Sequence, residues 1–277
     1  MKKYTFCFLL IAALFLAACG NDSQEMPATD PVPTEITVPV TTAAETEPVA
    51  TTLPAPTEPT ETVPETQPPL QLHSGLREDG SFADGVIFIG DSQTYLFVEQ
   101  YLKLNDLMGG AKSAAQCGAS VLTFWDDDVR PTQDKTVYCA FSPEFTDMTF
   151  REAISSVGAD ATAIYIMLGS NHVPNAGSES YIAIVDWLLE TCPNATVHLQ
   201  TIPRGMTPYL AVNGWLEETM AHYAQLEEPR VMLVDVCSAT VNHLNVDGVH
   251  VTAKGCGFWY EAIVSHAREM GLTAPAE

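Results

Sequence analysis

Four polar side chains follow apolar stretches of the sequence at positions where they could do chemistry. Ser92 comes shortly after the apolar run 86–89, and Asn171 comes shortly after another apolar run. Asp247 and His250 stand three residues apart near the C-terminus. A serine hydroxyl becomes a nucleophile when an imidazole accepts its proton, and a carboxylate can orient that imidazole. An Asn amide can donate to a developing oxyanion, so this set of residue types is typical of acyl transfer.

Each of these signals has a purely structural alternative. Asp and Ser are favoured helix N-caps, so Ser92 could simply begin a helix. Gly, Ser and Asn are common in turns, which would account for Asn171. A turn carrying a surface histidine would account for Asp247 and His250. The sequence around Ser92 is also not the Gly-x-Ser-x-Gly motif of the α/β-hydrolases.

The elements that must position these residues alternate between two patterns. Apolar runs of strand length lie at 86–89, 136–141, 161–168, 195–199 and 231–236. Helical spacing of apolar residues occurs between them, at 94–104, 150–157, 181–189, 216–223 and 258–266. Strands that are apolar on every residue are typical of a parallel sheet covered on both faces. The pattern predicts a three-layer α/β/α sandwich with a mainly parallel sheet of about five strands, in which functional residues gather at the carboxyl ends of the strands.

The motifs occur in an order that resembles the SGNH hydrolases, also called the GDSL esterase/lipase family, from about residue 84 to residue 270. Gly90-Asp91-Ser92 is similar to the first block of that family, Gly169-Ser170-Asn171 to the third, and Asp247-Gly248-Val249-His250 to the fifth. Gly118 is the best match to the single glycine of the second block. One departure is Gln93-Thr94-Tyr95, where the family usually has a small or hydroxyl residue, an aliphatic residue and a glycine.

This resemblance implies a serine esterase with a flavodoxin-like fold. Ser92 would be the nucleophile, His250 the general base and Asp247 the residue that orients it. The oxyanion hole would consist of the backbone N–H groups of Ser92 and Gly118 and the side chain of Asn171. The resemblance implies neither a metal ion nor an organic cofactor. Phe124 and Trp125 could line the substrate site or belong to the core.

The first quarter of the chain is predicted to lie outside the fold. Residues 1–19 have a basic start, an apolar run too short for a comfortable membrane span, and the ending Leu16-Ala17-Ala18-Cys19. That ending resembles a bacterial lipobox, which implies cleavage before Cys19 and lipidation of its thiol. Residues 20–72 contain 11 of the 19 prolines and no Lys or Arg, which predicts a disordered linker. Residues 73–277 are then the hydrolase-like domain.

Charge and cysteine content limit the partners. With 35 acidic and 12 basic residues the formal net charge is −23, which argues against nucleic acid. His243 and the acidic run Asp126-Asp127-Asp128 have no spacing typical of metal ligands. The five cysteines outside the leader are odd in number and lie mostly in apolar surroundings, which predicts free thiols: Cys117, Cys139, Cys192, Cys237 and Cys256.

The expected location gives a hypothesis about the substrate. Lipid on Cys19 would hold the protein to the outer face of a bacterial cell membrane, with the bilayer as one partner. A domain on a long linker could reach cell-wall or extracellular polysaccharide, which favours short-chain or O-acetyl esters on carbohydrate among the family's substrates. The alternative is a surface-displayed lipoprotein with the same fold that binds carbohydrate without catalysis.

Overall fold

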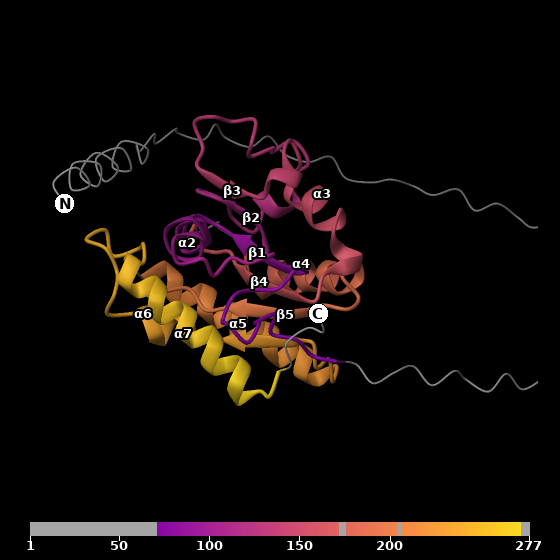
Figure 1. Ribbon diagram of the computed structural model, residues 1–277. Helices are drawn as coiled ribbons and strands as arrows, with labels where there is room; N and C mark the ends of the chain where they lie inside the picture. Colours follow the sequence, from indigo (N-terminus) through magenta and orange to yellow (C-terminus); the bar gives the residue numbers. More distant parts are fainter. Residues whose placement is uncertain (1–70, 172–175, 204–206, 273–277) are drawn as a thin grey trace, which may run out of the picture. The chain divides into compact units, whose positions relative to one another are not determined.

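The computed structural model describes residues 71–171, 176–203 and 207–272, whose arrangement is shown in Figure 1. Six strands form one sheet in the order β3-β2-β1-β4-β5-β6. They are β1 (Val86–Gly90), β2 (Lys112–Gln116), β3 (Cys139–Phe141), β4 (Ala163–Met167), β5 (Thr196–Gln200) and β6 (Val231–Val234). All neighbouring pairs are parallel except β2 and β3. The predicted mainly parallel sheet is confirmed, with six strands where about five were expected.

The two strands that differ from expectation lie together at one end of the sheet. β2 was not predicted, because its sequence Lys-Ser-Ala-Ala-Gln has only small residues in its buried centre. β3 occupies only the last three residues of the expected run 136–141 and pairs antiparallel with β2. As an edge strand with a single neighbour, β3 does not need the continuous burial on which the prediction relied.

Helices cover both faces of the sheet, which gives the predicted three layers (Figure 1). The α-helices are α2 (Ser92–Phe97), α3 (Phe150–Ser155), α4 (Ser178–Thr191), α5 (Thr207–Gln225), α6 (Val236–Thr240) and α7 (Ala253–Glu269). A π-helical turn and a 3-10 turn continue α2 to Asn105. On one face α2 packs against α7, and on the other α4 packs against α5. Each helical pattern seen in the sequence overlaps one of these segments.

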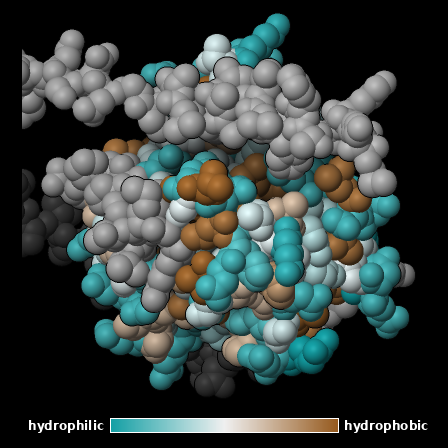
Figure 2. Space-filling model, turned by 90° about the vertical axis from the view of Figure 1, so that its left-hand side faces the viewer, coloured by the Kyte–Doolittle hydropathy of each residue, from teal (hydrophilic) through white to brown (hydrophobic). Residues whose placement is uncertain are grey.

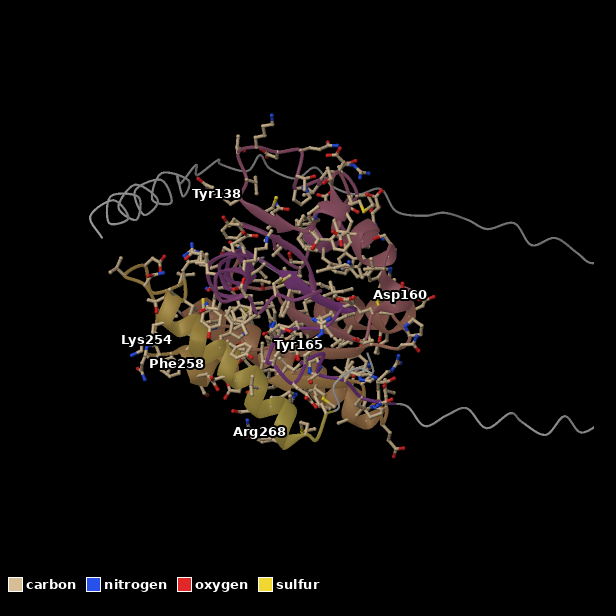
Figure 3. The ribbon with its side chains drawn as sticks, viewed as in Figure 1. Tyr138, Asp160, Tyr165, Lys254, Phe258 and Arg268 are labelled. Carbon is tan, nitrogen blue, oxygen red and sulfur yellow. The ribbon has the colours of Figure 1, made fainter. Side chains whose placement is uncertain are left out.

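Aromatic side chains join the sheet to the α2 and α7 layer. Phe97 of α2 stacks on Trp259 of α7 with ring centroids 4.4 Å apart, and Phe88 of β1 meets Phe97 edge-on at 5.9 Å. Tyr165 of β4 lies at the centre of the molecule (Figure 3), stacked on His198 of β5 at 4.5 Å. These rings are fully buried, and large buried rings contribute much of the apolar area removed from water.

The connections that leave β1 and β4 run to opposite sides of the sheet, although the two strands are parallel neighbours. From β1 the chain crosses to β2 on one side, whereas from β4 it crosses to β5 on the other. In such sheets a crevice opens outside the carboxyl ends of the two strands. Gly90 ends β1 there, and a Cβ at this position would lie 2.5 Å from the carbonyl oxygen of Met167. Glycine therefore permits the close approach of the two strand ends.

Several sequence-based expectations concern residues outside the described part. The signal segment, Cys19 and the linker up to residue 70 lie there, so lipidation and the domain boundaries stay predictions. Within the described ranges no helix is long and apolar enough to cross a membrane. All five domain cysteines are free thiols. The face of the molecule in Figure 2 shows hydrophobic side chains interspersed among hydrophilic ones.

Candidate active site

Ser92 lies at the first turn of α2, directly after β1. Asp91 caps this helix, since its Oδ1 accepts a hydrogen bond from the backbone N–H of Gln93 at 2.9 Å. The Ser92 side chain therefore lies at the carboxyl end of the sheet, as expected. Only 6% of Ser92 is exposed.

A chain of hydrogen bonds joins Ser92 to His250, which lies 158 positions later in the sequence, and His250 to Asp247. Nε2 of His250 lies 3.0 Å from Oγ of Ser92, and Nδ1 lies 2.8 Å from Oδ2 of Asp247. In the neutral imidazole one nitrogen carries the proton. With the carboxylate accepting from Nδ1–H, Nε2 is left to accept the Ser92 hydroxyl proton. The arrangement is that of a general base next to a hydroxyl nucleophile.

Asp247 is held in place by the backbone on which His250 stands. Its Oδ1 accepts hydrogen bonds from the N–H groups of Val249 at 2.9 Å and His250 at 3.0 Å. Desolvation by partial burial raises the pKa of Asp247, but the hydrogen bonds from the His250 imidazole and these two N–H groups outweigh it, so the pKa lies below its usual value. Asp247 is therefore ionised at neutral pH beside the imidazole.

The segment that carries Asp247 and His250 is a short antiparallel loop. Leu244 and Val251 form an isolated bridge, and the N–H of Asn245 donates to the carbonyl of His250 at 2.7 Å. The turn closes with a hydrogen bond from the N–H of Gly248 to the carbonyl of Asn245 at 2.9 Å. This loop, defined as residues 243–252, precedes α7, so His250 lies shortly before the first residue of the last helix.

Asp91 links the start of α2 to the end of β4, a role that sequence reasoning missed. It is completely buried, and its Oδ2 accepts the N–H groups of Ser170 at 2.9 Å and Gly169 at 3.3 Å. Burial raises the pKa of Asp91, with these N–H groups and that of Gln93 acting in the opposite direction. In the sequence Asp91 lies between an apolar run and the start of a helix, and an N-cap assignment already explained it.

Asn171 and Gly118 both lie at the carboxyl end of the sheet, after β4 and β2 respectively. Nδ2 of Asn171 donates to the carbonyl of Ala119 at 2.8 Å, which ties the end of β4 to the loop after β2. Gly118 has a φ of +85°, and space beside its Cα is open. Among the residues that the structure describes, none accepts a hydrogen bond from the N–H of Gly118. One proton of the Asn171 amide is engaged with Ala119, and the second is left to donate elsewhere.

Other residues singled out in the sequence have structural surroundings. Phe124 is buried in the core, whereas Trp125 is half-buried, and both rings meet Trp187 edge-on. Asp127 forms an ion pair with Arg151. His243 stacks on Phe258 at 4.3 Å. Within the described ranges no group of three or more His, Cys, Asp or Glu side chains is placed to hold a metal ion.

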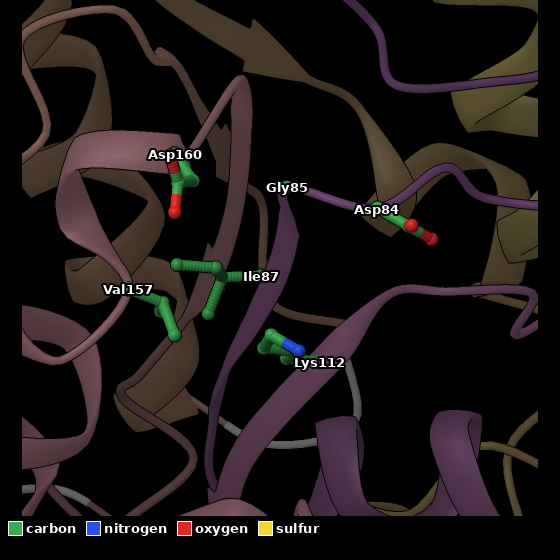
Figure 4. Close-up of a pocket in the computed structure, with 6 residues that line it drawn as sticks. All are labelled: Asp84, Gly85, Ile87, Lys112, Val157 and Asp160. Carbon is green, nitrogen blue, oxygen red and sulfur yellow. The ribbon is translucent and has the colours of Figure 1, made fainter. Parts of the chain in front are cut away.

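A cavity of about 330 Å³ lies at the opposite end of the strands (Figure 4). Its lining includes Gly85, which precedes β1, Lys112, which begins β2, and Asp160, which precedes β4. Ser92 follows β1, so this cavity is separate from the Ser92 site.

A three-layer α/β sandwich with a serine, a histidine and an aspartate in one hydrogen-bond chain at the strand ends has the architecture of a serine hydrolase. No family model matches the sequence, and no curated protein is similar to it by sequence. Among solved structures, a carbohydrate esterase family 3 protein from Talaromyces cellulolyticus shares 21% identity at a TM-score of 0.38, covering 67% of this chain and 96% of the other.

Two further solved structures are similar in the same range. A protein described as GDSL-like lipase from Parabacteroides merdae shares 12% identity at a TM-score of 0.46, covering 74% of this chain and 100% of the other. A variant of an acetyl-xylooligosaccharide esterase from Geobacillus shares 16% identity at a TM-score of 0.44, covering 71% and 99%.

Proposed function

We propose that the protein is an SGNH-type serine esterase that hydrolyses short-chain or O-acetyl esters. The observation that carries this proposal is the hydrogen-bond chain from Ser92 Oγ through His250 to Asp247, with distances of 3.0 and 2.8 Å. The motif resemblance of the three blocks supports it independently. A protein that only binds carbohydrate has no need of a serine aligned with an imidazole and a carboxylate.

In the first step Ser92 Oγ attacks the ester carbonyl and Nε2 of His250 accepts the hydroxyl proton. Asp247 stabilises the imidazolium that forms and keeps the ring in the tautomer that can accept at Nε2. The oxyanion receives hydrogen bonds from the N–H groups of Ser92 and Gly118 and from the second amide proton of Asn171. His250 then gives its proton to the departing alcohol, which leaves an acyl group on Ser92.

In the second step water takes the place of the alcohol. His250 accepts a proton from the water as it attacks the acyl carbonyl. As the tetrahedral intermediate collapses, the bond between the acyl carbon and Ser92 Oγ breaks, His250 returns the proton to Oγ, and the acid is released. The proposed residues complete both steps without a metal ion or an organic cofactor. Asp91 does not take part in proton transfer, because its two oxygens are engaged with backbone N–H groups.

The substrate class follows from the expected position of the protein. With lipid on Cys19 and a proline-rich linker of about 50 residues, the domain would stand away from the outer face of the membrane, at up to ~3.1 Å per residue. Acetylated polysaccharide of the cell wall or surroundings is within such a reach. Replacement of Cys19 by Ala should release the protein to the soluble fraction or leave it unprocessed, and a variant that fractionates and is processed like the parental protein would contradict the anchor.

The direct test of the function is acetate release from a panel of acetylated glycans, run beside a chromogenic short-chain ester. The parental protein should release acetate, and Ser92→Ala at equal concentration should not. Equal rates for the two proteins would place the nucleophile elsewhere. Binding to a glycan without hydrolysis of any ester would favour the non-catalytic carbohydrate-binding protein.

A further inference from the structure

Gln93 follows the proposed nucleophile in sequence and reaches across to the loop that carries His250. Its side chain is buried, with 1% of the residue exposed. Nε2 donates a hydrogen bond to the carbonyl of Val249 at 2.7 Å, and Oε1 accepts one from the N–H of Val251 at 3.2 Å. These two backbone groups flank His250 on either side.

The primary amide of Gln93 acts on this loop as a neighbouring strand would. In extended backbone the carbonyl of one residue and the N–H of the residue two positions later point to the same side. An amide is the side-chain group that offers one acceptor and one donor in the geometry of a peptide. Gln93 thus fixes the peptide planes before and after His250 with one side chain.

The backbone hydrogen bonds of His250 tie the loop to itself. The N–H of His250 donates to Asp247, and its carbonyl accepts from Asn245. These bonds shape loop 243–252 but do not set its distance from Ser92. The hydrogen bonds from Gln93 set this distance, because Gln93 is covalently attached to Ser92 and moves with it.

We propose that Gln93 is a positioning residue that holds His250 at hydrogen-bond distance from Ser92. This inference rests on the proposed function, since it assigns to Gln93 the alignment of the base with the nucleophile. Asp91 and Gln93, the two neighbours of Ser92 in sequence, then have matching tasks. Asp91 binds the strand end that leads to Asn171, and Gln93 binds the loop that carries His250.

The kinetic test is Gln93→Met, which keeps the length of the side chain and removes both hydrogen bonds. A displacement of about 1 Å in a reacting group can cost on the order of 10²-fold in rate. We expect kcat to fall by about 10- to 100-fold with KM within about twofold of the parental value, because the substrate-binding surfaces are unchanged. A parental kcat in Gln93→Met would overturn the proposal.

Gln93→Glu separates the two hydrogen bonds. The carboxylate keeps an acceptor for the N–H of Val251 but cannot donate to the carbonyl of Val249. We expect kcat to fall at least as far as in Gln93→Met, because a charge then faces that carbonyl oxygen. Parental activity in Gln93→Glu, measured at a pH high enough for the carboxyl to be ionised, would show that the bond to Val249 is not needed and would contradict the proposal.

Asn213 provides a matched control elsewhere in the fold. It is 7% exposed, and its amide binds both backbone groups of Ile202, accepting from the N–H at 2.7 Å and donating to the carbonyl at 2.9 Å. Asn213→Leu should lower thermal stability as Gln93→Met does, while its folded fraction keeps the parental kcat. An equal fall of kcat in both variants would show a general structural effect and overturn the positioning role.

Hydrogen exchange on the parental protein tests the hydrogen bonds of Gln93 to the loop without any variant and without ester hydrolysis. The amide proton of Val251 should be protected to a degree similar to that of Ile202, although it lies in a partly exposed loop. Exchange of the Val251 amide at the rate of a free loop amide would refute the positioning role of Gln93 even if the protein is an active esterase. Protection of Val251 in a protein that hydrolyses no ester would instead contradict the proposed function.

Discussion

The start of α2 and loop 243–252 supply the two halves of the proposed site, and they are built in opposite ways. Asp91, Ser92 and Gln93 are each no more than 6% exposed. In the loop, the Asp247 side chain is 44% exposed and that of His250 is 20% exposed. The proposed nucleophile therefore lies in a buried helix start that follows a core strand, whereas the proposed base lies on a segment near solvent that side-chain hydrogen bonds hold in position.

The two aspartates show the same contrast. Each accepts hydrogen bonds from backbone N–H groups. Desolvation raises the pKa of Asp91; it also acts on Asp247, but there the hydrogen bonds together outweigh it and lower the pKa. Asp91 accepts hydrogen bonds from the backbone N–H groups of Gln93, Gly169 and Ser170, whereas Asp247 also meets an imidazole. A carboxylate that must stabilise a transient imidazolium benefits from staying charged, whereas one that links backbone segments serves through its geometry.

The largest expected effect is the loss of Ser92 or His250. Ser92→Ala and His250→Ala should each lower kcat on the order of 10⁶-fold, and the double variant should lose little more, because both residues act in one proton transfer. Steady-state kinetics on a chromogenic ester, with circular dichroism to check the fold, measures this. Additive losses would mean that the two residues act separately.

Asp247→Asn should lower kcat less, on the order of 10²- to 10⁴-fold, because the exposed carboxylate is partly replaced by solvent in stabilising the imidazolium. Asp91→Asn should have the opposite profile. The amide of the introduced Asn would point its NH₂ group at backbone N–H groups that donate to Asp91 in the parental protein. The free energy of unfolding should therefore fall by about 1–3 kcal/mol. Kinetics and urea unfolding of both variants test the contrast, which fails if Asp247→Asn is the less stable protein.

Asn171→Ala should lower kcat by about 10²- to 10³-fold with little change in KM, since its amide meets charge that exists only in the tetrahedral intermediate. If Asn171 only ties the β4 end to the carbonyl of Ala119, the variant should instead melt earlier and keep its kcat. Kinetics and melting on the same preparation separate the two, and a parental kcat with a lowered Tm would remove Asn171 from the oxyanion hole.

His198 extends the contrast to a histidine that has no catalytic partner. It is fully buried, desolvation lowers its pKa to about 3, and its Nδ1 has no hydrogen-bond partner among the described residues. At a pH below about 6.5, the ordinary pKa of histidine, His198 is protonated in the unfolded chain but stays neutral in the folded protein. Stability should therefore fall as the pH drops from about 6.5 toward 3, by on the order of a few kcal/mol, and thermal unfolding of His198→Gln should depend less on pH in this window.

Site residues could be predicted from the sequence when the chemistry requires a particular type of side chain. Strands and helices could be predicted when their apolar pattern is strong. Ser92, Asp247 and His250 were predicted because hydroxyl, carboxylate and imidazole groups follow strand-like segments. β2 was not, because burial among close neighbours can be achieved with Ser113, Ala114 and Ala115 as well as with large apolar residues.

The supporting contacts could not be predicted in the same way. The bonds of Gln93 to residues 156 and 158 positions away depend on how α2 and loop 243–252 meet in the folded chain. In the sequence Gln93 was visible only as a departure from the usual first block. The partners of Asp91 at the end of β4 are likewise set by the neighbouring positions of β1 and β4 in the sheet.

Covalent trapping of Ser92 is the most direct test of the central claim. A fluorophosphonate ester phosphonylates a serine hydroxyl with loss of fluoride when a neighbouring base accepts the proton. Mass spectrometry of the parental protein should find one adduct, mapped to Ser92, and His250→Ala should form it far more slowly. An unmodified Ser92 in the folded parental protein, or an adduct that forms equally fast in His250→Ala, would contradict the account.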